Sequence, residues 1–266
     1  MPLFSLPNNN NYIVPKYKLH TCTVGGKNIS SYVSLIFCYL LNQKKYQTVL
    51  KYFDDIKGAM NPCHKINGPF TTKSVIKNYG KNSSDFWGEW KHLVIIKNPI
   101  DRFLDNFIDL CSNSSDKIKK SDCFNCNSSD MKCFLEKLYK DINKVMKNKK
   151  KIPNKRIKNY FYPQTSHCDY TLNHESIRYL NISLPYYQFS KQLINIIESS
   201  RVPKKDLTLI EKDISQKMEK HLLNNNGIER KLHEKTLYND NYLLDLVTKI
   251  YYQDFVAFNY QLPSFT

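Results

Sequence analysis

A short segment near the N-terminus combines the residue types that bind a phosphate-like anion. It follows a run of β-forming residues and reads Val24-Gly25-Gly26-Lys27-Asn28-Ile29-Ser30-Ser31. Glycines let the backbone approach an anion, N–H groups at a helix N-terminus point toward it, and lysine and serine add a charge and hydroxyl donors. An ordinary Gly-rich turn with a serine N-cap has the same composition. The segment alone therefore leaves an anion site and a structural turn as two open interpretations.

This segment is not a Walker A loop, whose pattern is G-x-x-x-x-G-K-[ST]. Asn28 follows Lys27, and Thr21 stands where the first glycine would be. The sequence therefore disfavours an ATPase or a GTPase.

A second group of charged residues follows a later predicted strand. Residues 91–96 form a short continuous apolar run, which is typical of a buried parallel strand. Asn98 and Pro99 come next, and an amphipathic helix is predicted over residues 100–111 because proline suits the first helical turn. Lys97, Arg102 and Asp105 lie at this predicted strand-to-helix turn.

The order of these segments resembles that of a known enzyme family. The run Lys97-Asn98-Pro99-Ile100-Asp101-Arg102-Phe103-Leu104-Asp105 is similar to the 3'-phosphate-binding motif of sulfotransferases: a strand ending in Arg, Asp/Asn-Pro, a spacer, Arg, Phe/Leu, and a Ser on the helix. Residues 27–31 stand where that family has its 5'-phosphosulfate loop, and further similar segments are residues 17–22, 161–165 and 251–263. Nearly the whole chain resembles carbohydrate sulfotransferases of the chondroitin and dermatan type.

This resemblance implies a reaction, a co-substrate and a set of site residues. The sulfuryl group of 3'-phosphoadenylyl sulfate (PAPS) would pass to a carbohydrate hydroxyl, releasing 3',5'-ADP, with no metal. Lys27 would have a catalytic role along the bridging oxygen. The implied co-substrate-binding residues are Gly26, Lys27, Asn28, Ile29, Ser30, Ser31, Lys97, Arg102 and Asp105.

The residues that follow Pro163-Gln164 supply candidates for the general base, without a firm assignment. His167, His174 and Glu175 cluster there, and a group with a pKa near neutral suits deprotonation of a sugar hydroxyl. We take His167 as the candidate. Each of the three is more often a surface or structural residue.

The chain departs from the family pattern at several positions. Lys97 replaces Arg, which keeps the charge and loses the bidentate fork. Asp105 replaces Ser; two like charges about 4 Å apart cost about 4 kcal/mol at an effective dielectric of about 20, unless the carboxylate is paired or turns away. Tyr160 stands where a histidine is expected, and one extra residue precedes Lys27. An inactive relative that binds an anionic glycan or a nucleotide is the alternative function.

Composition adds a third, more distant alternative. The 266 residues include 40 Lys+Arg and 24 Asp+Glu, a formal charge of +16, which suits a polyanion such as nucleic acid. Lys, Asn and Tyr are abundant along the whole chain, and no nucleic-acid motif is recognised, so no nucleic-acid partner is expected. The 41% hydrophobic content excludes wholesale disorder.

Cysteines and sequons bear on the compartment. Eight cysteines, an even number, suit disulfides, and zinc is the weaker alternative. Asn82, Asn113, Asn127 and Asn181 begin N-glycosylation sequons. No apolar run reaches the roughly 20 residues of a membrane span, and no signal peptide is visible. The resemblance implies the Golgi lumen and membrane-anchored relatives.

The predicted fold is α/β, a P-loop-like sulfotransferase fold whose mostly parallel central sheet is flanked by helices. We expect a disordered segment over residues 1–15 and a single domain over 16–266, with a Ser/Asn-rich, Cys-containing loop over 112–130 and a basic loop over 147–159. Strands are predicted over 16–24, 91–96 and 177–182, and an extended segment begins at 160. Further helices are predicted over 30–41, 47–56, 131–146, 187–199, 207–223 and 243–258.

Overall fold

The computed structural model describes residues 4–6, 10–24, 29–44, 63, 66–112, 120–148, 154–183, 185–212 and 227–264. The chain forms two compact units. The first, which we call the sheet unit, comprises Leu6–Ile96 and His167–Lys220. The second, the helical unit, comprises Met1–Ser5, Lys97–Ser166 and His221–Thr266.

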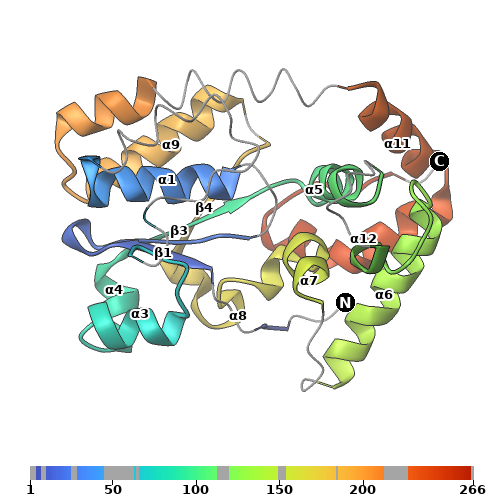
Figure 1. The fold of residues 1–266 in the computed structure, drawn as a ribbon, viewed down its shortest axis with the longest axis horizontal. Helices are drawn as coiled ribbons and strands as arrows, with labels where there is room; N and C mark the ends of the chain where they lie inside the picture. Colours follow the sequence, from blue (N-terminus) through green and yellow to red (C-terminus); the bar gives the residue numbers. More distant parts are fainter. Residues whose placement is uncertain are drawn as a thin grey trace. The chain divides into compact units, whose positions relative to one another are not determined.

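The sheet unit contains four described strands in the order β1-β2-β3-β4 (Figure 1). β1 (Asn11–Val14) pairs antiparallel with β2 (Leu19–Cys22), β2 pairs parallel with β3 (Lys91–Ile96), and β3 pairs parallel with β4 (Ile177–Asn181). The α/β class with a mostly parallel sheet is therefore confirmed. The apolar run of β3 is explained by its central position, where both faces of the strand are covered.

Strand β1 differs from the sequence expectation. Four residues of the predicted disordered segment form this strand, and the strand predicted over 16–24 is reduced to β2. Residues Pro15–Tyr17 form a short 3-10 helix, and Lys18 has a left-handed backbone with φ of 48°. Ile13 and Val14 are fully buried, so their burial orders a segment whose Asn-rich neighbours suggest disorder.

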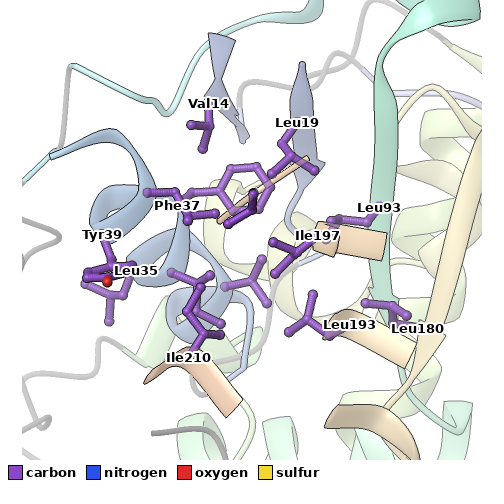
Figure 2. Close-up of a cluster of buried hydrophobic side chains, with 14 of the residues drawn as sticks. Val14, Leu19, Leu35, Phe37, Tyr39, Leu93, Leu180, Leu193, Ile197 and Ile210 are labelled. Atoms are coloured by element: carbon purple, nitrogen blue, oxygen red, sulfur yellow. The ribbon is translucent and has the colours of Figure 1, made fainter. Parts of the chain in front are cut away.

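Helices cover both faces of the sheet (Figure 1). α1 (Ile29–Leu41) and α9 (Tyr186–Ser199) lie on one face. Their side chains pack with those of the strands in one buried cluster, which Figure 2 shows; it includes Val14, Leu19, Phe37, Leu93, Leu180, Leu193 and Ile197. The helices predicted over 30–41 and 187–199 are thus confirmed, while residues 204–212 are helical and the rest of the helix predicted over 207–223 lies outside the described residues.

The other face carries two helices that were not predicted. α3 (Thr72–Tyr79) and α4 (Ser83–Glu89) fall outside every helix and strand expected from the sequence. Their first turns are capped by the side chains of Thr71 and Asn82, and Val75, Phe86 and Trp90 pack against Ile13 beneath the sheet. The helix predicted over 47–56 lies outside the described residues.

Five described helices form the core of the helical unit. They are α5 (Pro99–Phe107), α6 (Met131–Lys147), α7 (Lys155–Phe161), α11 (Ile228–Tyr238) and α12 (Asn241–Ala257). α5 continues as a π-helical turn over Ile108–Ser112. Sequence periodicity predicted α5, α6 and α12, whereas α7 and α11 were not predicted.

The extended segment expected from residue 160 is wrong. α7 runs to Phe161, Gln164–Ser166 form a 3-10 turn, and Tyr170–Asn173 form the short helix α8. The side chain of Asn154 accepts hydrogen bonds from the N–H groups of Arg156 and Ile157, which starts a helix inside the predicted basic loop.

The cysteines form four disulfides: Cys22–Cys168, Cys38–Cys63, Cys111–Cys123 and Cys126–Cys133. The expectation of disulfides is confirmed. All eight cysteines lie in the described part of the chain and are paired, which leaves no thiolate for the zinc alternative. Among the described residues, no helix has the length and apolar character needed to cross a membrane.

Candidate functional site

The first half of the candidate site is the connection between β2 and α1. Gly26, Lys27 and Asn28 lie outside the described residues. Ile29, Ser30 and Ser31 form the first turn of α1, as the sequence predicts for residues at a helix N-terminus.

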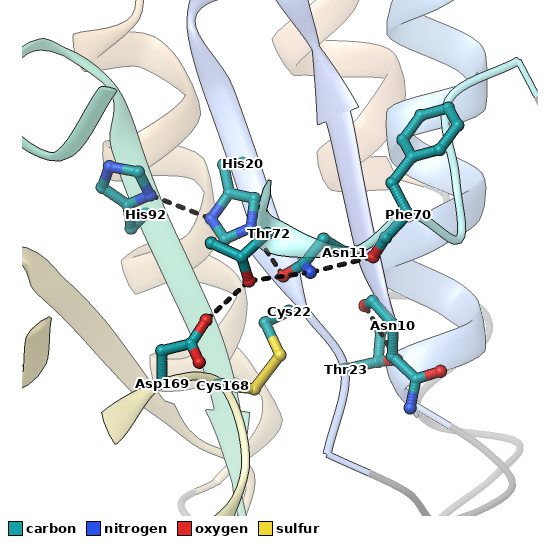
Figure 3. The surroundings of a disulfide bond; sticks show 10 residues. All are labelled: Asn10, Asn11, His20, Cys22, Thr23, Phe70, Thr72, His92, Cys168 and Asp169. Carbon is teal, nitrogen blue, oxygen red and sulfur yellow. Dashed lines mark hydrogen bonds between the residues drawn. A yellow bond between two sulfur atoms is a disulfide. The ribbon is translucent and has the colours of Figure 1, made fainter. Parts of the chain in front are cut away.

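Two disulfides fix the elements on either side of that connection. Cys22, the last residue of β2, is bonded to Cys168, and Cys38 in α1 is bonded to Cys63 (Figure 3 shows the first). Cys22 and Cys38 are both buried as well as cross-linked. Both ends of the predicted loop are therefore attached to covalently anchored elements.

The second half is the turn from β3 into α5. The side chain of Asn98 caps α5 by accepting from Ile100 N at 2.9 Å and Asp101 N at 3.3 Å, and Pro99 occupies the first helical turn. The side chain of Gln164 holds the main chain of Lys97 at both ends: Lys97 N donates to Gln164 Oε1 at 3.0 Å, and Gln164 Nε2 donates to Lys97 O at 2.8 Å. The backbone position of Lys97 is thus fixed by a partner 67 residues away.

Gln164 is itself held by α12. Asp254 Oδ2 accepts from Gln164 N at 2.7 Å, and Asp254 Oδ1 accepts from both the N–H and the hydroxyl of Thr165 at 2.9 Å. Asp254 is fully buried; burial raises the pKa of its carboxyl, and the hydrogen bonds from Thr165 and Gln164 oppose that rise. Segments 161–165 and 251–263 carry part of the family resemblance. They are thus joined by one hydrogen-bond network that holds the main chain of Lys97.

Arg102 adds two further hydrogen bonds near this network. Its side chain is buried, and its guanidinium donates to Tyr162 O at 2.9 Å and Asn159 O at 3.2 Å. Burial lowers the pKa of this guanidinium, and the nearby Tyr251 and Asp254 oppose the effect. These hydrogen bonds join α5 to the end of α7, and the co-substrate-binding role that the resemblance implies for Arg102 stays a prediction.

Asp105 is paired with two cations. One carboxylate oxygen forms an ion pair with Lys97 Nζ, and the other forms one with the guanidinium of Arg230 on α11. Arg230 also pairs with Asp101, with 2.5 Å between Nη2 and Oδ1. Asp105 is thus paired, which is the condition under which its expected repulsion of a phosphate is reduced. Sequence reasoning missed Arg230, because it lies on a helix that was not predicted and more than a hundred residues from its partners.

The three candidates for the general base differ in their exposure to solvent. His167 is only 2% exposed and precedes the disulfide-bonded Cys168, whereas His174 and Glu175 are exposed. A general base must touch the hydroxyl whose proton it accepts. The catalytic role of His167 stays a prediction. No group of three or more potential metal ligands occurs among the residues that the structure describes.

Comparison with known proteins agrees with these observations. Residues 9–261 match the sulfotransferase family. The chain is 28% identical to an uncharacterized protein of Caenorhabditis elegans over 95% of the chain and 69% of the relative. It is also 28% identical to the putative sulfotransferase vep-2 (81% and 67%) and 22% identical to the carbohydrate sulfotransferase chst-1 (93% and 74%), both of the same organism. No solved structure matches the chain significantly. Because the family match spans most of the chain, the protein belongs to the sulfotransferase family.

Proposed function

We propose that the chain transfers a sulfuryl group from PAPS to a hydroxyl of a carbohydrate, such as a glycosaminoglycan or a glycoprotein glycan. The observation that carries this proposal is the turn from β3 into α5. There the main chain of Lys97 is hydrogen-bonded to Gln164, and Gln164 is hydrogen-bonded to Asp254. Both partners lie on segments that resemble the family. The name of the relative chst-1 supports a carbohydrate acceptor. The chondroitin and dermatan subtype belongs to the same proposal.

In this proposal the chain positions two phosphate groups and stabilises charge. Residues 26–31 hold the 5'-phosphosulfate, and Lys97 holds the 3'-phosphate. Arg102 stabilises the turn from β3 into α5 by its hydrogen bonds to Tyr162 O and Asn159 O. The acceptor oxygen attacks sulfur, the bond from sulfur to the bridging oxygen breaks, and the hydroxyl proton passes to a base, for which His167 is the candidate. Lys27 stabilises the negative charge that develops on the bridging oxygen.

The four disulfides support a secretory-pathway location such as the Golgi lumen, because disulfides persist in oxidising compartments.

Binding of 3',5'-ADP tests the donor site without knowledge of the acceptor. We expect micromolar binding by calorimetry, weakening of at least about tenfold in Lys27→Ala, and no change in the control Lys18→Ala, whose partner is Glu89 on α4. Transfer of labelled sulfate from PAPS to a panel of glycans tests the acceptor class. A folded protein that binds 3',5'-ADP and labels no glycan would contradict the carbohydrate assignment alone.

A second candidate is a non-catalytic relative that binds an anionic glycan or nucleotide. It is favoured by the ion pairs of Asp105, which occupy the cation at the family's 3'-phosphate position. If the native chain does not bind 3',5'-ADP and the double variant Lys97→Arg/Asp105→Ser does, this candidate replaces the enzyme.

A further inference from the structure

We infer that Arg230 is the second cation of the phosphate-binding turn, and that Asp105 is an internal counter-ion that a bound phosphate must displace from Lys97 and Arg230. This inference rests on the proposed function, since it describes how that site binds the 3'-phosphate. Neither residue belongs to the motif that the chain shares with its family: Asp105 departs from it, and Arg230 lies outside it.

The two oxygens of the Asp105 carboxylate are each paired with a different cation, Lys97 and Arg230. Two cations that reach one small oxyanion group from two sides can also reach the oxygens of a phosphate at the same place. The carboxylate therefore marks the position where an anion is bound by this unit.

Lys97 and Arg230 differ in how they bind a phosphate. Lys97 is a point charge and lacks the planar fork with which arginine binds phosphate bidentately. Arg230 supplies a guanidinium at the same carboxylate. The pair Lys97 and Arg230 thus offers a phosphate both a point charge and a fork.

Arg230 keeps its position when Asp105 leaves. Its Nη2 pairs with Asp101 one helical turn before Asp105, while Nη1 pairs with Asp105. Displacing Asp105 frees Nη1 and leaves the Asp101 pair intact. The cluster of Lys97, Arg230, Asp101 and Asp105 has no net formal charge, and without the Asp105 charge it would have one positive charge.

The ion pairs of Asp105 can be exchanged. The side chains of Lys97, Asp105 and Arg230 are 26%, 29% and 18% exposed, so each is partly buried and still reached by water. A doubly charged phosphate offers the same cations stronger charge-assisted hydrogen bonds than a single carboxylate does. The internal carboxylate is therefore expected to lower affinity without closing the site.

The test compares 3',5'-ADP with 5'-AMP, which lacks the 3'-phosphate, by calorimetry on the folded full chain. We expect Asp105→Asn to bind 3',5'-ADP about tenfold more tightly and Arg230→Gln about tenfold more weakly, each with little change for 5'-AMP. Arg230→Lys should lie in between, because it keeps the charge and loses the fork. Circular dichroism checks that each variant is folded.

Matched controls remove the same charges elsewhere. Arg156→Gln breaks the Arg156–Asp122 pair of the same unit, and Asp245→Asn breaks the Asp245–Lys249 pair on α12. Equal affinity of wild type, Asp105→Asn and Arg230→Gln for 3',5'-ADP would overturn the inference and leave the proposed function standing. Absence of 3',5'-ADP binding in wild type and in Asp105→Asn would overturn both.

Discussion

Each unit holds its own candidate segment by different forces. In the sheet unit, β2 and α1 are held by disulfides and an apolar core. In the helical unit, the turn at Lys97 is held by charged groups, namely Arg102, Asp254, Asp105 and Arg230. The sheet unit should therefore respond little to ligand and salt, whereas the pairs of the helical unit can be exchanged for those of a bound anion.

The surroundings of Cys22–Cys168 show how the sheet unit is held (Figure 3). Asp169 accepts from the hydroxyl of Thr72 at 2.5 Å, and the amide of Asn11 donates to that hydroxyl at 3.2 Å. Asn11 in turn contacts His20, and His20 contacts His92, each at 2.9 Å. One hydrogen-bonded chain thus links β1, β2 and β3 to the residue that follows the disulfide.

The largest expected effect comes from breaking the long-range disulfide of the sheet unit. Cys22 and Cys168 are 146 residues apart, whereas Cys126 and Cys133 in the helical unit are 7 apart. Because the entropy of the unfolded chain that a cross-link removes grows with the enclosed loop, Cys22→Ser/Cys168→Ser should cost about 5 kcal/mol and Cys126→Ser/Cys133→Ser about 2 kcal/mol. Urea denaturation of the two double variants measures both losses.

Fluorescence separates the units in this experiment. The two tryptophans of the chain, Trp87 and Trp90, both belong to the sheet unit. Their emission should report unfolding of the sheet unit in Cys22→Ser/Cys168→Ser. Far-ultraviolet circular dichroism should also report unfolding of the helical unit in Cys126→Ser/Cys133→Ser. Equal losses of stability would refute the contrast drawn between the two cross-links.

The sequence predicted best those elements whose signals are local. The apolar run of β3, Asn98-Pro99 at the start of α5, and the periodicity of α6 and α12 each depend on neighbouring residues. Lys97, Arg102 and Asp105 could be placed at one turn for the same reason. Gly26, Lys27, Asn28 and His167 keep their roles as predictions.

The elements that sequence reasoning missed depend on distant partners. β1 is ordered by burial of Ile13 against α3 and α4 and by pairing with β2. Arg230 becomes part of the candidate site only because α11 packs on α5. A charged helix such as α11, which presents few buried residues, has a sequence that a solvated segment could also have.

Acid should weaken the sheet unit through its buried histidines. His92 Nε2 donates to Phe86 O at 2.8 Å, and His92 Nδ1 lies 2.9 Å from His20 Nδ1. Burial lowers the pKa of His92 to about 4 and lowers that of His20 well below its ordinary value. The unfolded chain binds these protons below about pH 6.5, so the stabilisation is complete above that pH and is lost as pH falls toward 4. The lowered pKa of His92 alone should reduce the free energy of unfolding by about 2 kcal/mol at about pH 5, compared with its value near pH 7.

Urea denaturation followed by tryptophan fluorescence at about pH 7 and about pH 5 measures this loss. His92→Gln should reduce the pH dependence, and His174→Gln, which changes an exposed histidine of the same unit, should leave it unchanged. A stability of the sheet unit that does not change between these two pH values would contradict the assignment of a buried neutral pair.

The smallest expected effect comes from helix caps, and it gives the sharpest comparison of the two units. Asn98 caps α5 in the helical unit, and Asn82 caps α4 in the sheet unit by accepting from Asp85 N at 2.8 Å. Replacing either by alanine should cost about 1 kcal/mol of stability, because each leaves helix N–H groups without their acceptor. Only Asn98→Ala should weaken 3',5'-ADP binding, since α5 carries Asp101 and Asp105 and begins directly after Lys97. Calorimetry on both variants, with their stabilities matched by urea denaturation, checks this difference. Equal affinities in the two variants would mean that the turn at Lys97 does not contribute to donor binding.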